Sequence, residues 1–277
     1  MPNTDISTDN YTFLQQHVYR ESGIVLDDSK QYLLEARLTP IARREGVNTV
    51  NDLCNLLRAV ARDDLRREVV EAMTTNETLF FRDLTPFDAL KSTVLPALKE
   101  RRATTRTLSV WSAAASTGQE AYSILMYLLE SGFADWNIRL LGTDLSEQVL
   151  ARAREGRYMQ VEVGRGLPAP MLIKYFDRVG LEWQVKEELR KRIRFEQFDL
   201  RRPMVGKGPF DLIFCRNVLI YFDLETKERI LTSMYRVLAP DGYLTLGAAE
   251  SMLQMNTQFE RTPIGKAAFY TKPGNAR

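Results

Sequence analysis

The sequence has few of the residues from which metal sites and disulfide frameworks are built. Its 277 residues include one histidine, His17, and two cysteines, Cys54 and Cys215, which lie far apart. A Cys/His zinc site needs several such ligands close together, so we predict no bound metal. Two distant cysteines in a chain of this size are typical of free thiols in a reducing compartment.

Long apolar runs and a large charge of one sign are also missing. No apolar stretch is long enough to cross a bilayer, and the polar first ten residues lack the pattern of a signal peptide. The formal net charge is +2, so composition does not force an attraction to nucleic acid. We therefore expect a cytoplasmic monomer that is neither inserted in a membrane nor bound to nucleic acid.

The pattern of apolar residues changes once along the chain. Residues 10–72 show helical periodicity without any strand alternation. Residues 74–85 lack a period, and a helix is predicted over residues 86–101. From Thr107 onward, strands and helices alternate, which indicates a mostly parallel sheet with helices on both faces. The predicted parts are a helical domain (1–73), a linker with a connecting helix (74–106) and an α/β domain (107–277).

One stretch of the α/β domain breaks the alternation. Residues 156–191 are rich in glycine and proline and end in a short alternating run, so we predict an insertion of short strands and a helix. Near the C-terminus, a long helix is predicted over residues 224–238, ended by Pro240-Asp241-Gly242, and a closing hairpin over residues 259–272. The strands predicted for the sheet are residues 108–111, 138–143, 193–198, 210–215 and 243–246.

Polar residues follow successive predicted strands. In an open parallel sheet, ligands bind at the carboxyl ends of the strands. The small side chains of residues 112–118 would let a ligand approach the backbone, although one glycine is a weak signal. Asp144 follows the second strand, where a carboxylate can accept both hydroxyls of a ribose. It could instead cap the following helix, a role that Ser146 could also fill.

Two further polar residues extend this series and favour one cofactor. Asp199 lies beside Phe198, a combination that suits an adenine ring, and Asn217 follows the next strand. A ribose-binding carboxylate fits NAD as well as S-adenosylmethionine (SAM). However, a pyrophosphate needs more glycine than the first loop offers, and the closing hairpin matches the antiparallel strand of SAM methyltransferase sheets. We therefore predict a Rossmann-like SAM methyltransferase sheet.

Three strings of the sequence resemble one family. They are TTNETLFFRD (74–83), VWSAAASTGQEAYS (110–123) and FDLIFCRNVLIYF (210–222). In this order and spacing they resemble the chemotaxis receptor methyltransferases, the CheR family, and the likeness runs from Tyr11 to the C-terminal strands. One departure is Gln119-Glu120-Ala121, where the family usually has Glu-Glu-Pro; Glu120 itself is retained.

The resemblance implies a cofactor site, a substrate and a product. The substrate would be glutamate side chains on the cytoplasmic helices of methyl-accepting chemoreceptors, and the products a glutamyl methyl ester and S-adenosylhomocysteine. Residues 156–191 would be the family's small β-subdomain, which in some members docks a receptor peptide; the short turn between residues 179 and 183 leads us not to assume such docking. The implied cofactor residues are Asn76, Thr78, Arg82, Glu120, Asp144, Asp199, Leu200, Asn217 and Val218.

Methyl transfer to a carboxylate needs alignment more than acid-base chemistry. A glutamate with a pKa of about 4.3 is already ionised at neutral pH, so proximity and orientation supply most of the rate. Arg82 is the first candidate catalytic residue, as a fork for the substrate carboxylate or for that of SAM; the alternative is a local pair with Asp83. Tyr221 is the second, with a core aromatic as its alternative. Cys215 ends an apolar strand and is expected to be inert.

Three arginines of the helical domain are candidates for docking the substrate. Arg58, Arg62 and Arg66 recur every four residues, which would place them on one helix face. Acidic receptor helices would suit such a surface. The alternative is a solvated face whose charge is balanced by nearby carboxylates, namely Asp63, Asp64 and Glu68.

Two other functions remain open from the residues alone. One is a SAM methyltransferase for small molecules or nucleic acid, against which the helical domain and the string at residues 74–83 argue. The other is a non-catalytic SAM-binding module in a signalling array. The retained Arg82, Asp144 and Asn217 argue against a degenerate site, but binding residues alone do not establish turnover.

Overall fold

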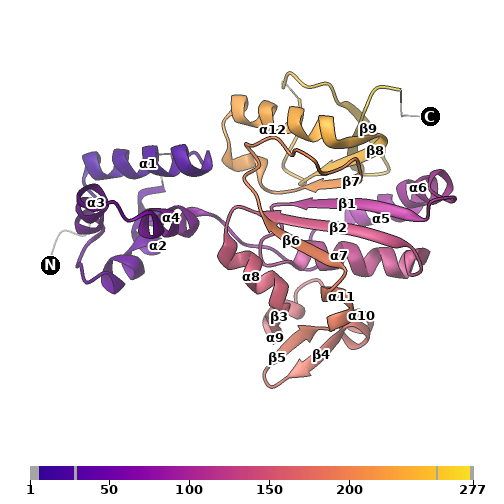
Figure 1. The fold of residues 1–277 in the computed structure, drawn as a ribbon, viewed down its shortest axis with the longest axis horizontal. Helices are drawn as coiled ribbons and strands as arrows, with labels where there is room; N and C mark the ends of the chain where they lie inside the picture. The colour runs from indigo at the N-terminus through magenta and orange to yellow at the C-terminus, as the bar shows by residue number, and fades with distance from the viewer. Residues whose placement is uncertain (1–5, 28–29, 254, 275–277) are drawn as a thin grey trace. The chain divides into compact units, whose positions relative to one another are not determined.

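The computed structural model describes residues 6–27, 30–253 and 255–274 (Figure 1). Its contacts divide the chain into two compact units. The helical unit runs to Thr75 and includes residues 221–226, and the α/β unit holds residues 76–220 and those from 227 onward. The predicted linker and connecting helix (74–106) therefore belong, from residue 76 onward, to the α/β unit. Within the described ranges, no helix combines the length and apolar character that crossing a membrane requires.

The helical unit contains the helices that the periodicity predicted. Ser7 caps α1 by accepting the N–H of Asn10, and Gly23 ends it with a φ of 77°. A reciprocal pair of hydrogen bonds between Thr49 and Asp52 fixes the start of α3, as expected for a capping box. Buried aliphatic side chains from all four helices form the core. The helices are α1 (Thr8–Ser22), α2 (Gln31–Arg44), α3 (Val50–Ala59) and α4 (Asp63–Met73).

The predicted common face of the three arginines is wrong. Arg58 lies on α3, Arg62 occupies the position before α4, and Arg66 lies on α4. The chain between the helices is extended, with Val60 at φ −123° and ψ 130°. Two acidic residues in the first turn of α4 favour a new helix start here because they interact well with a helix N-terminus. The spacing of four residues therefore runs across a break between two helices, and it does not place the three arginines on one helix face.

The α/β unit is built on a seven-stranded sheet in the order β6-β2-β1-β7-β8-β10-β9. The first five strands are parallel, and β10 pairs antiparallel with both β8 and β9. The predicted closing hairpin is therefore present. The strands are β1 (Thr107–Ala113), β2 (Asn137–Asp144), β6 (Ile193–Gln197), β7 (Phe210–Cys215), β8 (Leu238–Leu246), β9 (Glu260–Ile264) and β10 (Ala267–Thr271).

The helices of this unit follow the predicted alternation, with two differences. The predicted helix over residues 86–101 starts at residue 84 and widens into a π-turn before Pro96; proline has no N–H for the carbonyl four residues back. β8 starts at Leu238, so the expected stop at Pro240-Asp241-Gly242 lies inside a strand, beside an irregular register. Such bulges accommodate proline within sheets. The helices are α5 (Leu84–Ala89), η2 (Leu90–Val94), α6 (Leu95–Arg101), α7 (Gln119–Leu128), η3 (Leu129–Phe133), α8 (Glu147–Glu155), η4 (Leu219–Tyr221) and α12 (Leu224–Val237).

The predicted insertion forms a small antiparallel sheet in the order β3-β5-β4, beyond α8 in Figure 1. Tyr158 on β3 is fully buried, and its hydroxyl donates to the carbonyl of Thr117 at 2.7 Å. Its ring packs edge-on against Phe80, which also contacts Phe176. The insertion is thus anchored to the main part of the unit. Its elements are β3 (Arg157–Met159), α9 (Gln160–Val163), α10 (Ala169–Tyr175), β4 (Phe176–Val179), β5 (Glu182–Val185) and α11 (Glu187–Arg190).

Candidate functional site

The topology brings the polar residues predicted after successive strands to one edge of the sheet. Asp144 ends β2, Asp199 follows β6 by two residues, and Asn217 follows β7 by two residues. Because β6, β2, β1 and β7 are neighbours and parallel, their carboxyl ends lie side by side. Backbone hydrogen bonds extend this alignment beyond the strands: Phe198 donates to the carbonyl of Asp144, and Ala115 to that of Thr143, both at 2.8 Å.

Asp144 is held in place by backbone donors. Its carboxylate accepts the N–H of Ser116 at 2.9 Å and the N–H of Ser146 at 3.1 Å, and the residue is 8% exposed. Ser146 caps α8 by accepting the N–H of Val149, so Asp144 is not the helix cap. The aspartate therefore ties the loop after β1 to the end of β2, and its contact with a ribose stays a prediction.

The β1–α7 loop (residues 114–118) has an unusual backbone. Ala114 and Ser116 have φ values of 61° and 50°, and Gly118 has 96°. Positive φ is costly for residues with a Cβ and persists where the surroundings fix it. Here Ser116 donates its hydroxyl to the carbonyl of Asn76 at 2.8 Å. The loop is thus bonded to the junction segment (residues 74–83), which carries the first family string.

A buried ionic network joins three parts of the site. Glu120, in the first turn of α7, accepts the hydroxyl of Ser112 at 2.8 Å and Nη1 of Arg216 at 3.1 Å. Nη2 of Arg216 donates to the carbonyl of Arg82 at 2.7 Å and to Asp83 at 2.9 Å. Burial raises the pKa of the Glu120 carboxyl, and the charge of Arg216 opposes this effect. Arg216 was not among the predicted site residues.

Arg82 does not form the local pair that was its alternative role. Its Nη1 donates to the carbonyl of Glu77 at 3.2 Å, whereas Asp83 pairs with Arg216. No carboxylate within the described ranges forms an ion pair with Arg82. Its role as a fork for an external carboxylate stays a prediction.

Asp199 has a partner that the sequence analysis did not consider. Nε and Nη2 of Arg201 donate to its carboxylate at 3.0 and 2.7 Å, and the N–H of Arg201 adds a bond at 2.9 Å. The neighbouring Leu200 is buried and supplies an apolar side chain. This pairing fixes the direction of the carboxylate, while its contact with adenine stays a prediction.

Glu250 organises the turn that follows β7. Its carboxylate accepts the N–H groups of Asn217 at 2.7 Å, Val218 at 2.9 Å, Ile220 at 3.2 Å and Gly247 at 2.7 Å. These bonds support the positive φ of 58° at Asn217. Glu250 was not among the predicted site residues, although it follows β8 as the other site residues follow their strands.

Tyr221 groups by contacts with the helical unit. Its carbonyl accepts the N–H of Val25 at 2.9 Å, and its side chain packs against the helical core. This packing matches the alternative of a core aromatic. A catalytic role for its hydroxyl stays a prediction.

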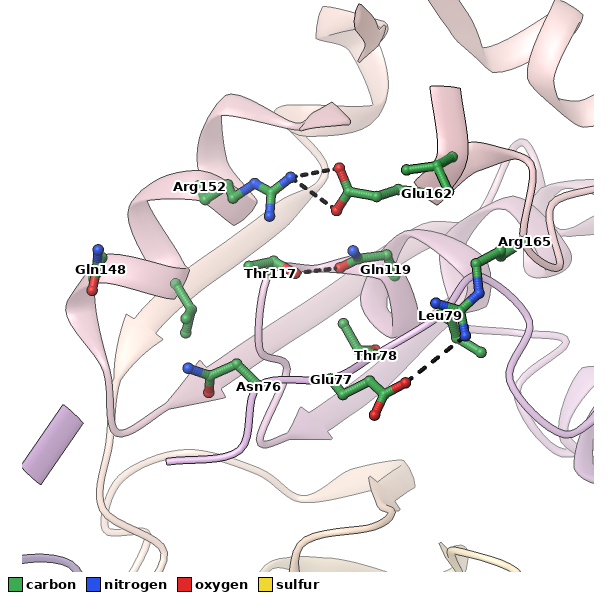
Figure 2. Close-up of a pocket in the computed structure, with 12 residues that line it drawn as sticks. Asn76, Glu77, Thr78, Leu79, Thr117, Gln119, Gln148, Arg152, Glu162 and Arg165 are labelled. Carbon is green, nitrogen blue, oxygen red and sulfur yellow. Dashed lines mark hydrogen bonds and ion pairs between the residues drawn. The ribbon is translucent and has the colours of Figure 1, made fainter. Parts of the chain in front are cut away.

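A cavity of about 420 Å³ opens beside the β1–α7 loop (Figure 2). Asn76 and Thr78 line it, together with side chains from α8 and the insertion, whereas the other predicted cofactor residues do not. Arg152 pairs with both oxygens of Glu162 at 2.8 and 2.6 Å across one side. The cavity lining is Asn76, Glu77, Thr78, Leu79, Thr117, Gln119, Gln148, Val149, Arg152, Val161, Glu162 and Arg165.

The three candidate docking arginines all have partners within the helical unit. Arg58 pairs with Asp9 at 2.9 Å and lies 4.4 Å from the centre of the Phe13 ring. Arg66 donates to the carbonyl of Leu57 at 3.1 Å. Their charges are therefore partly offset by the unit itself.

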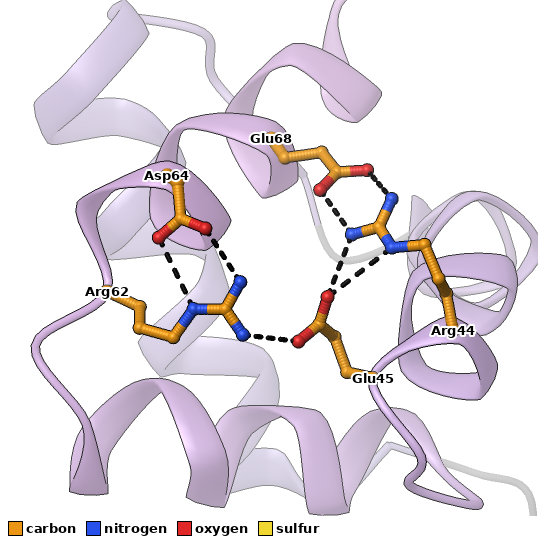
Figure 3. Close-up of polar contacts among 5 residues, drawn as sticks. All are labelled: Arg44, Glu45, Arg62, Asp64 and Glu68. Carbon is orange, nitrogen blue, oxygen red and sulfur yellow. Dashed lines mark hydrogen bonds and ion pairs between the residues drawn. The ribbon is translucent and has the colours of Figure 1, made fainter.

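Arg62 belongs to a five-residue ionic network (Figure 3). It pairs with Glu45 at 2.5 Å and with Asp64 at 2.6 Å. Glu45 also accepts from Arg44 at 3.0 Å, and Arg44 pairs in turn with Glu68. Such exposed pairs contribute little to stability, but they reduce the charge that Arg62 presents to a partner.

Two models of known protein families match this chain. A model described as the all-alpha domain of CheR methyltransferases matches residues 9–74, and a model of their SAM-binding domain matches residues 76–268. The chain belongs to the CheR methyltransferase family. This confirms the resemblance carried by the three strings and the predicted fold class. It also confirms SAM as the cofactor of this CheR protein.

Relatives match this CheR protein over most of their length. "Chemotaxis protein methyltransferase Cher2" of Pseudomonas putida is 38% identical over 273 residues, 96% of this chain and 99% of the relative. "Chemotaxis protein methyltransferase 1" of Pseudomonas aeruginosa is 40% identical over 254 residues, 90% and 92% of the two chains. Among solved structures, a TehB-like SAM-dependent methyltransferase of Corynebacterium glutamicum has a TM-score of 0.38 at 16% identity, covering 68% of this chain and 95% of that one.

Proposed function

We propose that this CheR protein transfers the methyl group of SAM to glutamate side chains on the cytoplasmic helices of chemoreceptors, for chemotactic adaptation. The main support is its identity of 38% to a chemotaxis protein methyltransferase across 99% of that relative's length. The ordered carboxylates at the sheet edge support it further. We propose that it works in the cytoplasm as a monomer, with residues 1–73 docking the receptor and residues 107–277 carrying the transferase site.

The proposed reaction is an in-line displacement. A glutamate oxygen attacks the methyl carbon of SAM, the carbon–sulfur bond breaks, and S-adenosylhomocysteine leaves with the bonding electron pair. Because the carboxylate is ionised at neutral pH, no proton has to be removed. The absence of any histidine after His17 is compatible with this chemistry. The protein then contributes by aligning and desolvating the two reactants.

Each predicted site residue has a proposed role toward SAM or the substrate. Asp144 accepts the ribose hydroxyls, and Asp199 with Leu200 borders the adenine. Glu120 faces the methionine part of SAM, whose ammonium group suits a carboxylate. Arg82 binds a carboxylate, and Tyr221 places a hydroxyl near the reacting sulfur. The remaining proposed cofactor contacts are Asn76, Thr78, Asn217 and Val218.

The product tests this proposal. Incubation with methyl-labelled SAM and receptor-containing membranes should label the receptors, and mild alkali should release the label as methanol, because esters hydrolyse under these conditions. Membranes without chemoreceptors are the control. Label that resists alkali would indicate nitrogen methylation and would overturn the proposed substrate class.

A further inference from the structure

Arg216 is a buried cation at the centre of the site. It directly follows β7, and its side chain is 1% exposed. A buried charge is costly unless it is paired and hydrogen-bonded. Arg216 pairs with Glu120 and Asp83, but its Nε lacks a hydrogen-bond partner within the described part of the chain. Maintaining such a group at this position suggests a role beyond packing.

The two arms of Arg216 hold different elements. Nη1 reaches Glu120 at the start of α7, while Nη2 reaches the carbonyl of Arg82 and the carboxylate of Asp83. The backbone held by Nη2 is strained, with φ values of 50° at Phe81 and 56° at Asp83. Strained backbone persists only where neighbouring groups fix it. Arg216 therefore fixes the peptide from which the Arg82 side chain projects.

We propose that Arg216 is a positioning residue for methyl transfer, which holds Glu120 for the cofactor and the backbone of Arg82 for the carboxylate of the substrate. This inference rests on the proposed function, because it assumes that Glu120 and Arg82 belong to the site. Arg216 acts through these two residues and not by contact with the reacting atoms. Its two arms predict two separable defects, one in SAM binding and one in methylation.

The arm to Glu120 predicts a dependence on pH. The titratable and charged groups that face Glu120 are Arg216, Arg82 and the thiol of Cys215, while Ser112 donates a hydrogen bond. Burial raises the pKa of Glu120, and the charge of Arg216 has the largest effect in the opposite direction. Without Arg216 the carboxyl would take up a proton at a higher pH. Since a neutral carboxyl binds an ammonium group poorly, SAM affinity should then fall as the pH decreases.

The experiment measures SAM affinity by calorimetry across the neutral pH range. Arg216→Met should lower the affinity about tenfold at the acidic end, the order expected when a charge-assisted hydrogen bond to the ammonium group of SAM is lost, and less at the alkaline end. Arg216→Lys should restore part of the affinity because it retains a charge. Glu120→Gln should weaken binding and abolish the extra loss of affinity at the acidic end, and adding Arg216→Met to it should not restore that loss.

Arg102→Met is the matched control. Arg102 is another largely buried arginine, paired with Asp211 at 2.8 Å and Asp241 at 2.6 Å, but it lies at the amino ends of the strands. Its replacement should lower the thermal unfolding temperature and leave SAM affinity unchanged at every pH. If Arg216→Met behaves in the same way, Arg216 is only structural and the proposal is overturned.

The second arm is tested on a more exposed residue, so that misfolding does not obscure the result. Asp83→Asn changes a side chain that is 39% exposed. It should lower the kcat of receptor methylation several-fold while SAM affinity stays within about twofold. An unchanged kcat would contradict the role of this arm. If Glu120→Gln leaves SAM affinity unchanged, Glu120 lies outside the site and this inference fails, whereas alkali-labile labelling of receptors would still support the proposed function.

Discussion

At the scale of single residues, the carboxyl edge of the sheet is held together by side chains that lie far apart in the sequence. Strand patterns indicated that Asp144, Asp199 and Asn217 follow successive strands, and the topology places them at one edge. The groups that hold the site come from distant parts of the sequence: Glu250 is 33 residues from Asn217, and Arg216 is 96 from Glu120. No local pattern encodes such contacts, because they arise only when the sheet has formed.

Asp144→Ala should weaken the binding of SAM and S-adenosylhomocysteine by about 1–3 kcal/mol, the cost of losing buried hydrogen bonds. Two effects contribute, since the proposed ribose contacts disappear and the N–H groups of Ser116 and Ser146 lose their acceptor. Calorimetry with both ligands measures the change. Asp177→Ala, at an exposed position on β4, is the control. Unchanged affinity in the first variant would remove Asp144 from the cofactor site.

At the scale of elements, periodicity predicted the helices but misled where two of them meet. The spacing of four that linked Arg58, Arg62 and Arg66 runs across the break between α3 and α4. Likewise, Pro240-Asp241-Gly242 looked like a stop, but it lies within β8, where Arg102 binds Asp241. In the first case the acidic first turn of α4 favours a new helix start. In the second case the contact with Arg102 accompanies the strand, and the local sequence gave no signal of it.

The anchoring of the insertion gives a prediction at this scale. Tyr158→Phe removes the hydroxyl that donates to Thr117 and leaves a buried carbonyl unpaired, which should cost about 1–3 kcal/mol of stability. Because that carbonyl belongs to the β1–α7 loop, SAM affinity should also fall. Denaturant unfolding and calorimetry measure the two effects.

Tyr122→Phe is the matched control for this change. The Tyr122 hydroxyl is equally buried and donates to the carbonyl of Ala153 at 2.7 Å, on α8 and outside the loop. Its loss should destabilise the protein similarly without altering SAM affinity. Equal effects of the two variants on SAM binding would mean that the insertion does not support the loop.

At the scale of the whole molecule, the fold class and the family were both predictable. The change from helical periodicity to alternating strands and helices indicated where the helical part ends and the α/β part begins. Three separated strings of the sequence indicated the CheR family. The grouping of residues 221–226 with the helical unit was not predictable. That segment begins six residues after the end of β7, and only contacts such as the bond from Val25 to Tyr221 reveal where it groups.

The proposed docking of a receptor by the helical unit belongs to the scale of the whole molecule. Receptor methylation should slow as ionic strength rises, because exposed charges steer association and are screened beyond about 8–10 Å at physiological salt. Replacing Arg58 and Arg62 with alanine should lower the second-order rate constant for receptor and flatten its salt dependence. SAM affinity should not change, since the proposed cofactor residues near the sheet edge are untouched.

The control for this experiment replaces two other exposed arginines of the helical unit, Arg43 and Arg67. Arg58 and Arg62 are paired, whereas no carboxylate of the described chain forms an ion pair with the exposed Arg43 or Arg67. Replacing Arg43 and Arg67 with alanine changes the net charge by the same amount. If net charge alone steers the receptor, both double variants will flatten the salt dependence equally. If Arg58 and Arg62 contact the receptor, their variant will also lose rate at high salt, where steering is screened. Wild-type rates and salt slope in the Arg58 and Arg62 variant would place the docking surface elsewhere.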